Sequence, residues 1–122
     1  MELTLQTNKS ALFIKNYEDS CLFIADKVYD HNIVIVENII SKWNIDNISN
    51  LKIDDFEDIV NIKPEIIIIG TGKEPIIPKL EIIKNIQDRQ IGIEFMRTES
   101  ACKTFNLLLS EERNVAVFCW FK

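Results

Sequence analysis

The chain has 122 residues, of which 47% are hydrophobic and 27% are charged, and its formal net charge is −5. This length suits one domain with a single core, and we expect residues 1–122 to form one. Binding to nucleic acid requires a cluster of basic side chains. The lysines and arginines of this chain are scattered among carboxylates, so we expect no nucleic-acid partner.

The cysteines and the N-terminus indicate a cellular compartment. Cys21, Cys102 and Cys119 are far apart in the sequence, and an odd, unclustered set is neither a disulfide framework nor a zinc site. The first ten residues lack the basic start and apolar core of a signal peptide, and no apolar run approaches the ~20 residues needed to span a bilayer. We therefore expect free thiols, a reducing bacterial cytoplasm and no direct insertion into a membrane.

The first half of the chain, to about residue 62, contains short apolar segments between polar breaks, which is typical of antiparallel strands. The 22 isoleucines favour strands as well, because β-branched side chains fit a pleated sheet. We expect turns at 16–20 and 30–32, and a short helix over 55–62 that is capped by Asp54. The expected strands are Ala11–Ile14, Cys21–Ile24 and Ile33–Val36.

The second half follows a β-α-β-α-β pattern. Residues 65–69 include four consecutive isoleucines, which is typical of a strand buried on both faces of a parallel sheet. Leu80, Ile83, Ile86 and Gln87 have helical spacing, so we expect a helix there, with Pro78 in its first turn. Further strands are expected at 91–96 and 115–121.

The helix between the last two strands has the clearest pattern. Thr98 is the expected N-cap, because its hydroxyl suits the free amides of a helix start. An apolar stripe at helical spacing then predicts the face that packs against the sheet. Its members are Ala101, Cys102, Phe105, Leu108 and Leu109.

These elements predict an α/β fold with an N-terminal strand-rich half and a C-terminal β-α-β-α-β half. The right-handed crossover rule favours parallel pairing of the three C-terminal strands. Ligands of open α/β sheets bind beyond the carboxyl ends of the strands. We therefore expect residues 70–73 and 96–98 to meet at one rim of the sheet.

No set of residues in the sequence supports catalysis. Nucleophilic catalysis needs a base within hydrogen-bond reach, but the only histidine is His31, in a polar turn of the other half. Cys102 lies on the apolar stripe, where a buried structural thiol is the favoured interpretation. One histidine and no C-x-x-C pair leave no metal site of diagnostic spacing. We therefore predict no catalytic, cofactor-binding or metal-binding residues, and no enzyme.

The sequence Gly70-Thr71-Gly72-Lys73 follows a strand, as phosphate-binding loops do. The third glycine and the Gly-Lys-Ser/Thr ending of such loops are absent, and two nearby prolines, Pro75 and Pro78, remove amide donors. A turn that ends the strand is the favoured interpretation. If an anion does bind, the expected donors are Lys73, Arg97 and the amides that open the helix at Thr98.

Two charged segments have two interpretations each. The acidic stretch 54–58 is either the solvated start of a helix, which acids suit, or a patch for a basic partner. Glu111 and Glu112 oppose the dipole at the end of the last helix, whereas Arg113 agrees with it. These three residues are either solvated, or Glu111 and Arg113 pair with each other or with a partner.

The G-T-G sequence and a longer pattern of fixed spacing from Glu94 to Val115 resemble a known family. It is the small α/β domain family of unknown function that includes the mitochondrial NADH dehydrogenase (respiratory complex I) assembly factor. The resemblance covers roughly residues 60–120 and implies three layers around a mixed sheet. Arg97, Phe105 and Glu112 stand where this family usually has an acid, a tyrosine and a glycine. The positions that carry the longer pattern are Glu94, Met96, Thr98, Ala101, Cys102, Thr104, Phe105, Asn106, Leu108, Glu111, Arg113 and Val115.

The resemblance implies a non-enzymatic interaction protein, similar to an assembly factor for a respiratory NADH:quinone oxidoreductase. Its expected partners are subunits of that complex or another assembly factor. The alternative is a small-molecule or anion-binding protein, or an enzyme of unknown reaction, that uses the loop after the strand Ile66–Ile69; a plain structural subunit is a third hypothesis. The candidate rim for an anion or a partner comprises Gly70, Thr71, Gly72, Lys73, Arg97, Thr98 and Asn106.

Overall fold

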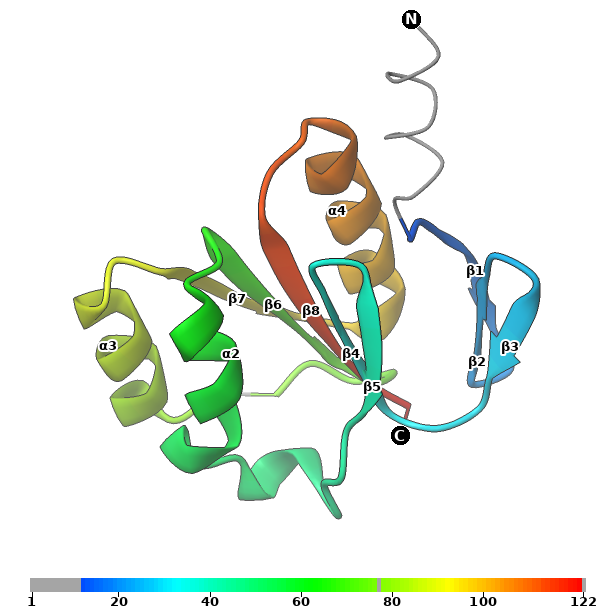
Figure 1. Ribbon diagram of the computed structural model, residues 1–122. Coiled ribbons are helices and arrows are strands. Elements are labelled where there is room, and N and C mark those ends of the chain that lie inside the picture. Colours follow the sequence, from blue (N-terminus) through cyan, green and yellow to red (C-terminus); the bar gives the residue numbers. More distant parts are fainter. Residues whose placement is uncertain (1–11, 77, 122) are drawn as a thin grey trace, which may run out of the picture.

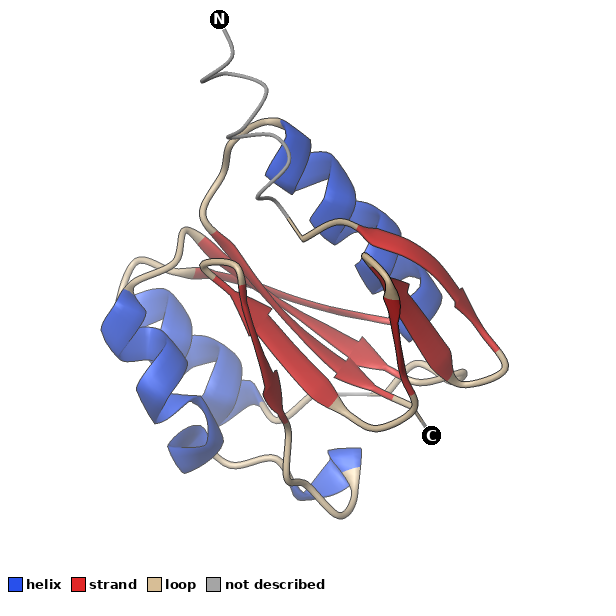
Figure 2. Ribbon diagram, turned by 45° about the vertical axis from the view of Figure 1, so that its right-hand side comes forward, coloured by secondary structure: helices blue, strands red, loops and turns tan. Residues whose placement is uncertain are grey.

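The computed structural model describes residues 12–76 and 78–121. Three layers are stacked in it, with helices α2 and α3 on one face of a five-stranded sheet, and helix α4 and a three-stranded sheet on the other (Figures 1 and 2). The predicted three-layer α/β architecture is therefore confirmed. In chain order the elements are β1 (Ile14–Glu18), β2 (Cys21–Ile24), β3 (Lys27–Tyr29), β4 (Ile33–Val36), β5 (Ile39–Lys42), η1 (Ile48–Asn50), η2 (Ile53–Phe56), α2 (Glu57–Ile62), β6 (Ile66–Thr71), α3 (Leu80–Asp88), β7 (Gly92–Met96), α4 (Thr98–Ser110) and β8 (Val115–Trp120).

The five-stranded sheet is mixed and has the order β5-β4-β8-β6-β7. Strand β6 pairs in parallel with both β7 and β8, as predicted for the C-terminal half. Strand β4 pairs antiparallel with β5 and with β8, so two strands of the first half extend the sheet at one side. The remaining strands form an antiparallel meander in the order β1-β2-β3.

Strand β6 explains the run of isoleucines. Ile67 and Ile69 belong to the core under α2 and α3, whereas Ile68 belongs to the core under α4. All three side chains are fully buried. Because both faces of the sheet are covered, both sets of alternating side chains must be apolar.

In the first half, the expected strands at 21–24 and 33–36 are confirmed, but the expectation for the first strand was wrong. It begins at Ile14 and continues to Glu18, through residues that we expected to form a turn, while Ala11 lies outside the described residues. The turn itself contains only Asp19 and Ser20, both at positive φ. Polar residues are tolerated in β1 because its backbone pairs with β2 while exposed side chains such as Asn16 remain in solvent.

The expected start of one helix was also wrong. The segment expected as one helix is a 3₁₀ turn followed by α2, and the carboxylate that caps its start belongs to Asp55, which accepts from the backbone N–H of Lys52 at 2.8 Å. Asp54 itself is exposed. In α3 the buried residues are Ile82 and Ile86, whereas Leu80 is 77% exposed. The helix turns Leu80 roughly 120–160° away from Ile82 and Ile86, so it lies on the side opposite the buried face.

The apolar stripe of α4 packs against the sheet as predicted. Ala101, Cys102 and Phe105 are buried, and Leu108 and Leu109 are half-buried against the same core. The helix ends with two reverse hydrogen bonds, from the N–H of Arg113 to the carbonyl oxygen of Leu108 and from the N–H of Glu112 to that of Leu109. These two bonds are those of a Schellman motif.

Candidate functional site

The structure brings the loops after β6 and β7 together at one end of the sheet. Gly70 and Met96 are the last pair of register partners in the parallel strands β6 and β7. Just beyond them, the backbone N–H of Thr98 donates to the carbonyl oxygen of Gly72 at 3.0 Å. Residues 70–73 and 96–98 therefore form one rim at the carboxyl ends of the strands, where open α/β sheets bind ligands.

Thr98 holds this rim together from the inside. Its side chain is fully buried, and its hydroxyl accepts from the N–H of Gly72 at 2.8 Å and donates to the carbonyl oxygen of Trp120 at 2.6 Å. The prediction that Thr98 is the N-cap was wrong, since Arg97 occupies that position and Thr98 is the first helical residue. Thr98 thus joins α4 to β8 and to the loop after β6. Its only hydroxyl proton is already donated, so this hydroxyl cannot donate to an anion.

The G-T-G sequence is explained by packing. A Cβ atom on Gly70 would lie 2.9 Å from the Cα and 2.9 Å from the Oγ1 of Thr98, so only glycine lets α4 begin this close to β6. The hydroxyl of Thr71 is buried and lies 2.8 Å from the carbonyl oxygen of Glu74. Gly72 has a φ of 88°, which favours glycine. Because Thr98 already uses the N–H of Gly72, this loop is a turn that ends β6 rather than a phosphate cradle.

Side chains around the rim enclose a cavity of about 250 Å³, which we call the rim pocket. It is lined by Tyr17, Gly72, Lys73, Arg97 and Glu99. Lys73 and Arg97 are exposed, and within the described part of the chain no carboxylate lies within 4.0 Å of either cation. Glu99 contributes the one carboxylate of the lining, so the cations are in excess.

Tyr17, from strand β1 of the meander, forms one wall of the rim pocket. Its hydroxyl oxygen is buried and has no hydrogen-bond partner among the described residues. Burial raises the pKa of Tyr17, and the neighbouring thiols of Cys102 and Cys119 and the carboxylate of Glu99 raise it further. The hydroxyl therefore stays protonated at neutral pH and remains a hydrogen-bond donor.

The start of α4 adds backbone donors to the same rim. Arg97 at the N-cap makes no side-chain capping bond, so the amides of Glu99 and Ser100 in the first turn have no side-chain acceptor. The positive end of the helix dipole lies at this same rim. An anion in the rim pocket would therefore meet Lys73, Arg97 and, at Glu99, the first turn of α4.

Asn106 is the one predicted rim residue that the structure places elsewhere. It lies two turns farther along α4, where its Nδ2 donates to the carbonyl oxygen of Ile14 at 2.7 Å and its Oδ1 accepts from the N–H of Ile14 at 2.8 Å. Both functional groups of the amide are thus used to attach β1 to α4. Asn106 therefore has a structural role in this contact, and it does not line the rim pocket.

Among the described residues, the cysteines and the histidine do not line the rim pocket. Cys102 and Cys119 are buried and free, and both a hydrogen bond with Cys102 and burial raise the pKa of the Cys119 thiol. His31 is exposed beside Asp30, at 3.5 Å. In residues 12–76 and 78–121, no three histidine, cysteine or acidic side chains are grouped to hold a metal ion. Across the same residues, no helix is both long enough and apolar enough to cross a bilayer.

Residues 14–119 match the family described as protein of unknown function, DUF498/DUF598. The chain belongs to this family. A 13 kDa major membrane protein of Francisella tularensis subspecies holarctica is 35% identical over 118 residues, which cover 93% of this chain and 96% of that protein. The NADH dehydrogenase [ubiquinone] 1 alpha subcomplex assembly factor 3 of Drosophila melanogaster is 33% identical over 95 residues, covering 75% of this chain and 48% of that protein.

A solved structure shows the same fold. The crystal structure of a protein from Bordetella parapertussis superposes with a TM-score of 0.84 at 23% identity, covering 92% of this chain and 98% of that one. The resemblance inferred from the G-T-G sequence and the α4 pattern is therefore confirmed. The chain spans about half the length of the assembly factors that it matches.

Sequence reasoning missed two residues of the rim pocket. Tyr17 is far from Arg97 in the sequence and reaches the pocket only because the meander folds over α4. Glu99 follows Thr98 directly, and its position in the first turn was the signal that could have identified it.

Proposed function

We propose that this protein is a non-enzymatic interaction protein that takes part in the assembly of a respiratory NADH:quinone oxidoreductase. The observation that carries the proposal is the 33% identity with an assembly factor for NADH dehydrogenase over three quarters of this chain. Its partners would be subunits of that enzyme or another assembly factor, in the reducing cytoplasm of a bacterium. The Francisella relative is named a membrane protein, but our proposal includes no association with a membrane.

We further propose the rim pocket as the surface that captures an acidic segment of the partner. Lys73 and Arg97 stand together on a chain with a net charge of −5. Charges arranged in this way steer an acidic partner and select its orientation, more than they add to affinity. Glu99 at the same pocket would repel a second carboxylate and so limit how that segment can lie.

The test is an affinity pull-down from the native organism with the tagged protein. We expect respiratory NADH dehydrogenase subunits to co-purify with the wild type, and Lys73→Glu/Arg97→Glu to lower their recovery without changing the melting temperature. The matched control is Lys84→Glu/Arg89→Glu, which reverses two exposed charges on α3 away from the rim. Recovery of no respiratory subunit would contradict the proposed role.

An unchanged recovery with the rim variant would contradict the proposed surface only. The acidic stretch 54–58 is then the next candidate, since Asp54, Asp55, Glu57 and Asp58 are all exposed.

A second candidate function is binding of a small anion, by an anion-binding protein or an enzyme of unknown reaction. The cations Lys73 and Arg97 at the rim pocket favour it, because neither has a carboxylate within 4.0 Å among the described residues. A titration with inorganic phosphate, followed by NMR, tests this function. Shifts that saturate at Gly72 and Glu99 and vanish in Lys73→Glu/Arg97→Glu would support it, whereas an absence of saturable shifts would exclude it.

A further inference from the structure

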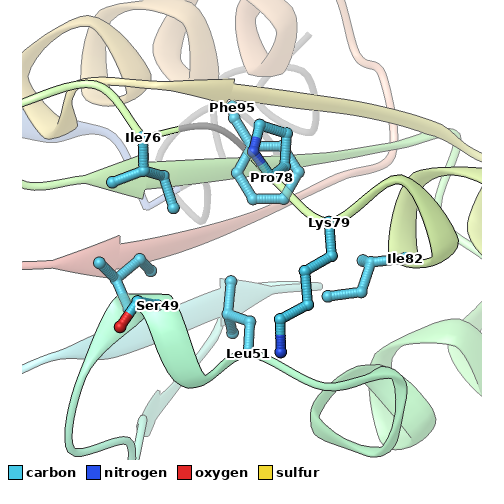
Figure 3. A pocket seen from close by; sticks show the side chains of 8 residues that line it. Ser49, Leu51, Ile76, Pro78, Lys79, Ile82 and Phe95 are labelled. Atoms are coloured by element: carbon cyan, nitrogen blue, oxygen red, sulfur yellow. The ribbon is translucent and has the colours of Figure 1, made fainter.

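A smaller cavity lies on the other face of the sheet, between η1, the start of α3 and β7. Its volume is about 110 Å³, and Figure 3 shows that side chains from three separate segments converge on it. We call it the crossover pocket, because the loop that crosses from β6 to α3 forms one of its walls. Its apolar walls are Ile48, Leu51, Ile76, Pro78, Ile82 and Phe95.

The size of the crossover pocket indicates its occupant. Sites that enclose a small-molecule ligand usually measure about 300–1,000 Å³, whereas an apolar cavity of about 150 Å³ holds a molecule the size of benzene. A cavity of 110 Å³ therefore suits one aliphatic side chain, such as that of leucine. Interfaces are commonly anchored in this way, by a single buried side chain in a well-packed pocket.

A positively charged side chain, that of Lys79, lines the crossover pocket. Ser49 and Lys79 are its two polar lining residues, and in Figure 3 the Lys79 side chain runs from the crossover loop toward Leu51 and ends in its ammonium group. Lys79 is exposed, and no carboxylate lies within 4.0 Å of it in the portion that the structure describes. An incoming carboxylate would complement this charge while its neighbour fills the cavity.

We propose that the crossover pocket binds a partner protein through one leucine-like side chain that is followed by an aspartate or a glutamate. The inference rests on the proposed function, because it describes the partner that an assembly factor would hold. Lys73 lines the rim pocket and Lys79 lines the crossover pocket. An acidic partner segment that reaches both pockets would meet a cation at each.

The first experiment measures binding to the crossover pocket without a partner protein. The probe is the blocked dipeptide N-acetyl-Leu-Asp-amide, and the readout is ¹⁵N NMR of the full chain. We expect saturable shifts at the amides of Leu51, Ile82 and Phe95. The probe N-acetyl-Ala-Asp-amide should bind about tenfold more weakly or worse, because it lacks most of the buried apolar area. The probe N-acetyl-Leu-Asn-amide should bind about twofold to fivefold more weakly, as the loss of one exposed ion pair predicts.

Two variants test the role of the charge. Lys79→Glu should weaken the Leu-Asp probe at least about fivefold, whereas Lys84→Glu, the same change on the exposed surface of α3, should leave it unchanged within about twofold. Equal binding of the Leu and Ala probes, shifts confined to other residues, or equal effects of the two variants would each overturn the inference. Binding of free 4-methylpentanoate as tight as that of the dipeptide would also overturn it, in favour of a small carboxylate.

The second experiment separates this inference from the proposed function. Lys79→Glu is compared with Lys73→Glu/Arg97→Glu in the pull-down. If the rim variant loses the respiratory subunits and Lys79→Glu retains them fully, the crossover pocket is not the partner site, although the assembly role stands. If the dipeptide binds as expected and the wild type captures no respiratory subunit, the assembly role fails and the pocket keeps its assignment as a peptide site.

Discussion

Replacement of Glu112 by glycine should stabilise this protein. Glu112 follows the C-cap of α4 and has a φ of 60°, in the left-handed region. The Schellman hydrogen bonds at Leu108 and Leu109 require this conformation. It costs an L-residue about 1–2 kcal/mol, and glycine adopts it without that cost. Glycine is also the residue that the resembling family usually has here.

The expected gain follows from two opposing effects. Relief of the left-handed strain contributes about 1–2 kcal/mol, and the greater freedom of glycine in the unfolded chain removes about 0.5–1 kcal/mol. Loss of an exposed negative charge at a helix C-terminus adds about 0.3 kcal/mol. The net gain is about 1 kcal/mol, which in a domain of this size raises the melting temperature by about 3–5 °C. Thermal unfolding followed by circular dichroism measures it.

Two controls isolate the backbone effect. Glu112→Gln removes the charge and keeps the strain, so it should give only the few tenths of a kcal/mol due to the dipole. Glu111→Gly removes the same charge one residue earlier, where φ is −91° and there is no strain to relieve. The freedom of glycine costs about 0.5–1 kcal/mol and the loss of the charge returns about 0.3 kcal/mol, so the protein should be destabilised by about 0.2–0.7 kcal/mol. If Glu112→Gly lowers the melting temperature as Glu111→Gly does, the conformational argument is wrong.

Two further predictions concern the core under α4. Phe105→Ala should cost about 3–5 kcal/mol in a chemical denaturation experiment, because Phe105 is 1% exposed; Leu107→Ala, at a position 59% exposed on the same helix, should cost less than about 1 kcal/mol. A melting temperature lowered by only a degree or two in Phe105→Ala would show that another face of α4 is buried. A thiol reagent should label the half-buried Cys21 first, and Cys102 and Cys119 only slowly until denaturant is added. Rapid labelling of Cys102 in the native protein would point to a reactive thiol.

Local patterns predicted the elements whose neighbours along the chain determine them. The four isoleucines of β6 predicted a strand buried on both faces, and the stripe from Ala101 to Leu109 predicted the buried face of α4. In both cases the periodicity of apolar side chains records which side of the element meets the core. Leu80 fits the helical spacing but not the buried face, because the helix turns it roughly 120–160° away from Ile82 and Ile86.

The site depended on contacts that no local pattern contains. Thr98 was expected to cap its own helix. Its hydroxyl instead bonds to the backbone of Gly72, just after β6, and of Trp120 on β8, both distant in sequence. Asn106 was expected at the rim, but the backbone of Ile14 occupies its amide. Burial and long-range hydrogen bonds compete with local preferences, and they prevail because a buried polar group without a partner is costly.

By itself, the sequence determined the α/β class, the parallel pairing of the three C-terminal strands and the meeting of residues 70–73 with 96–98. Those properties follow from apolar periodicity and from the handedness of crossovers, which act along the chain. Only the tertiary structure decided that Tyr17 completes the rim pocket and that η1, the crossover loop and Phe95 enclose a second cavity. A cavity is the space left between elements that are distant in sequence, so it depends on how all of them pack at once.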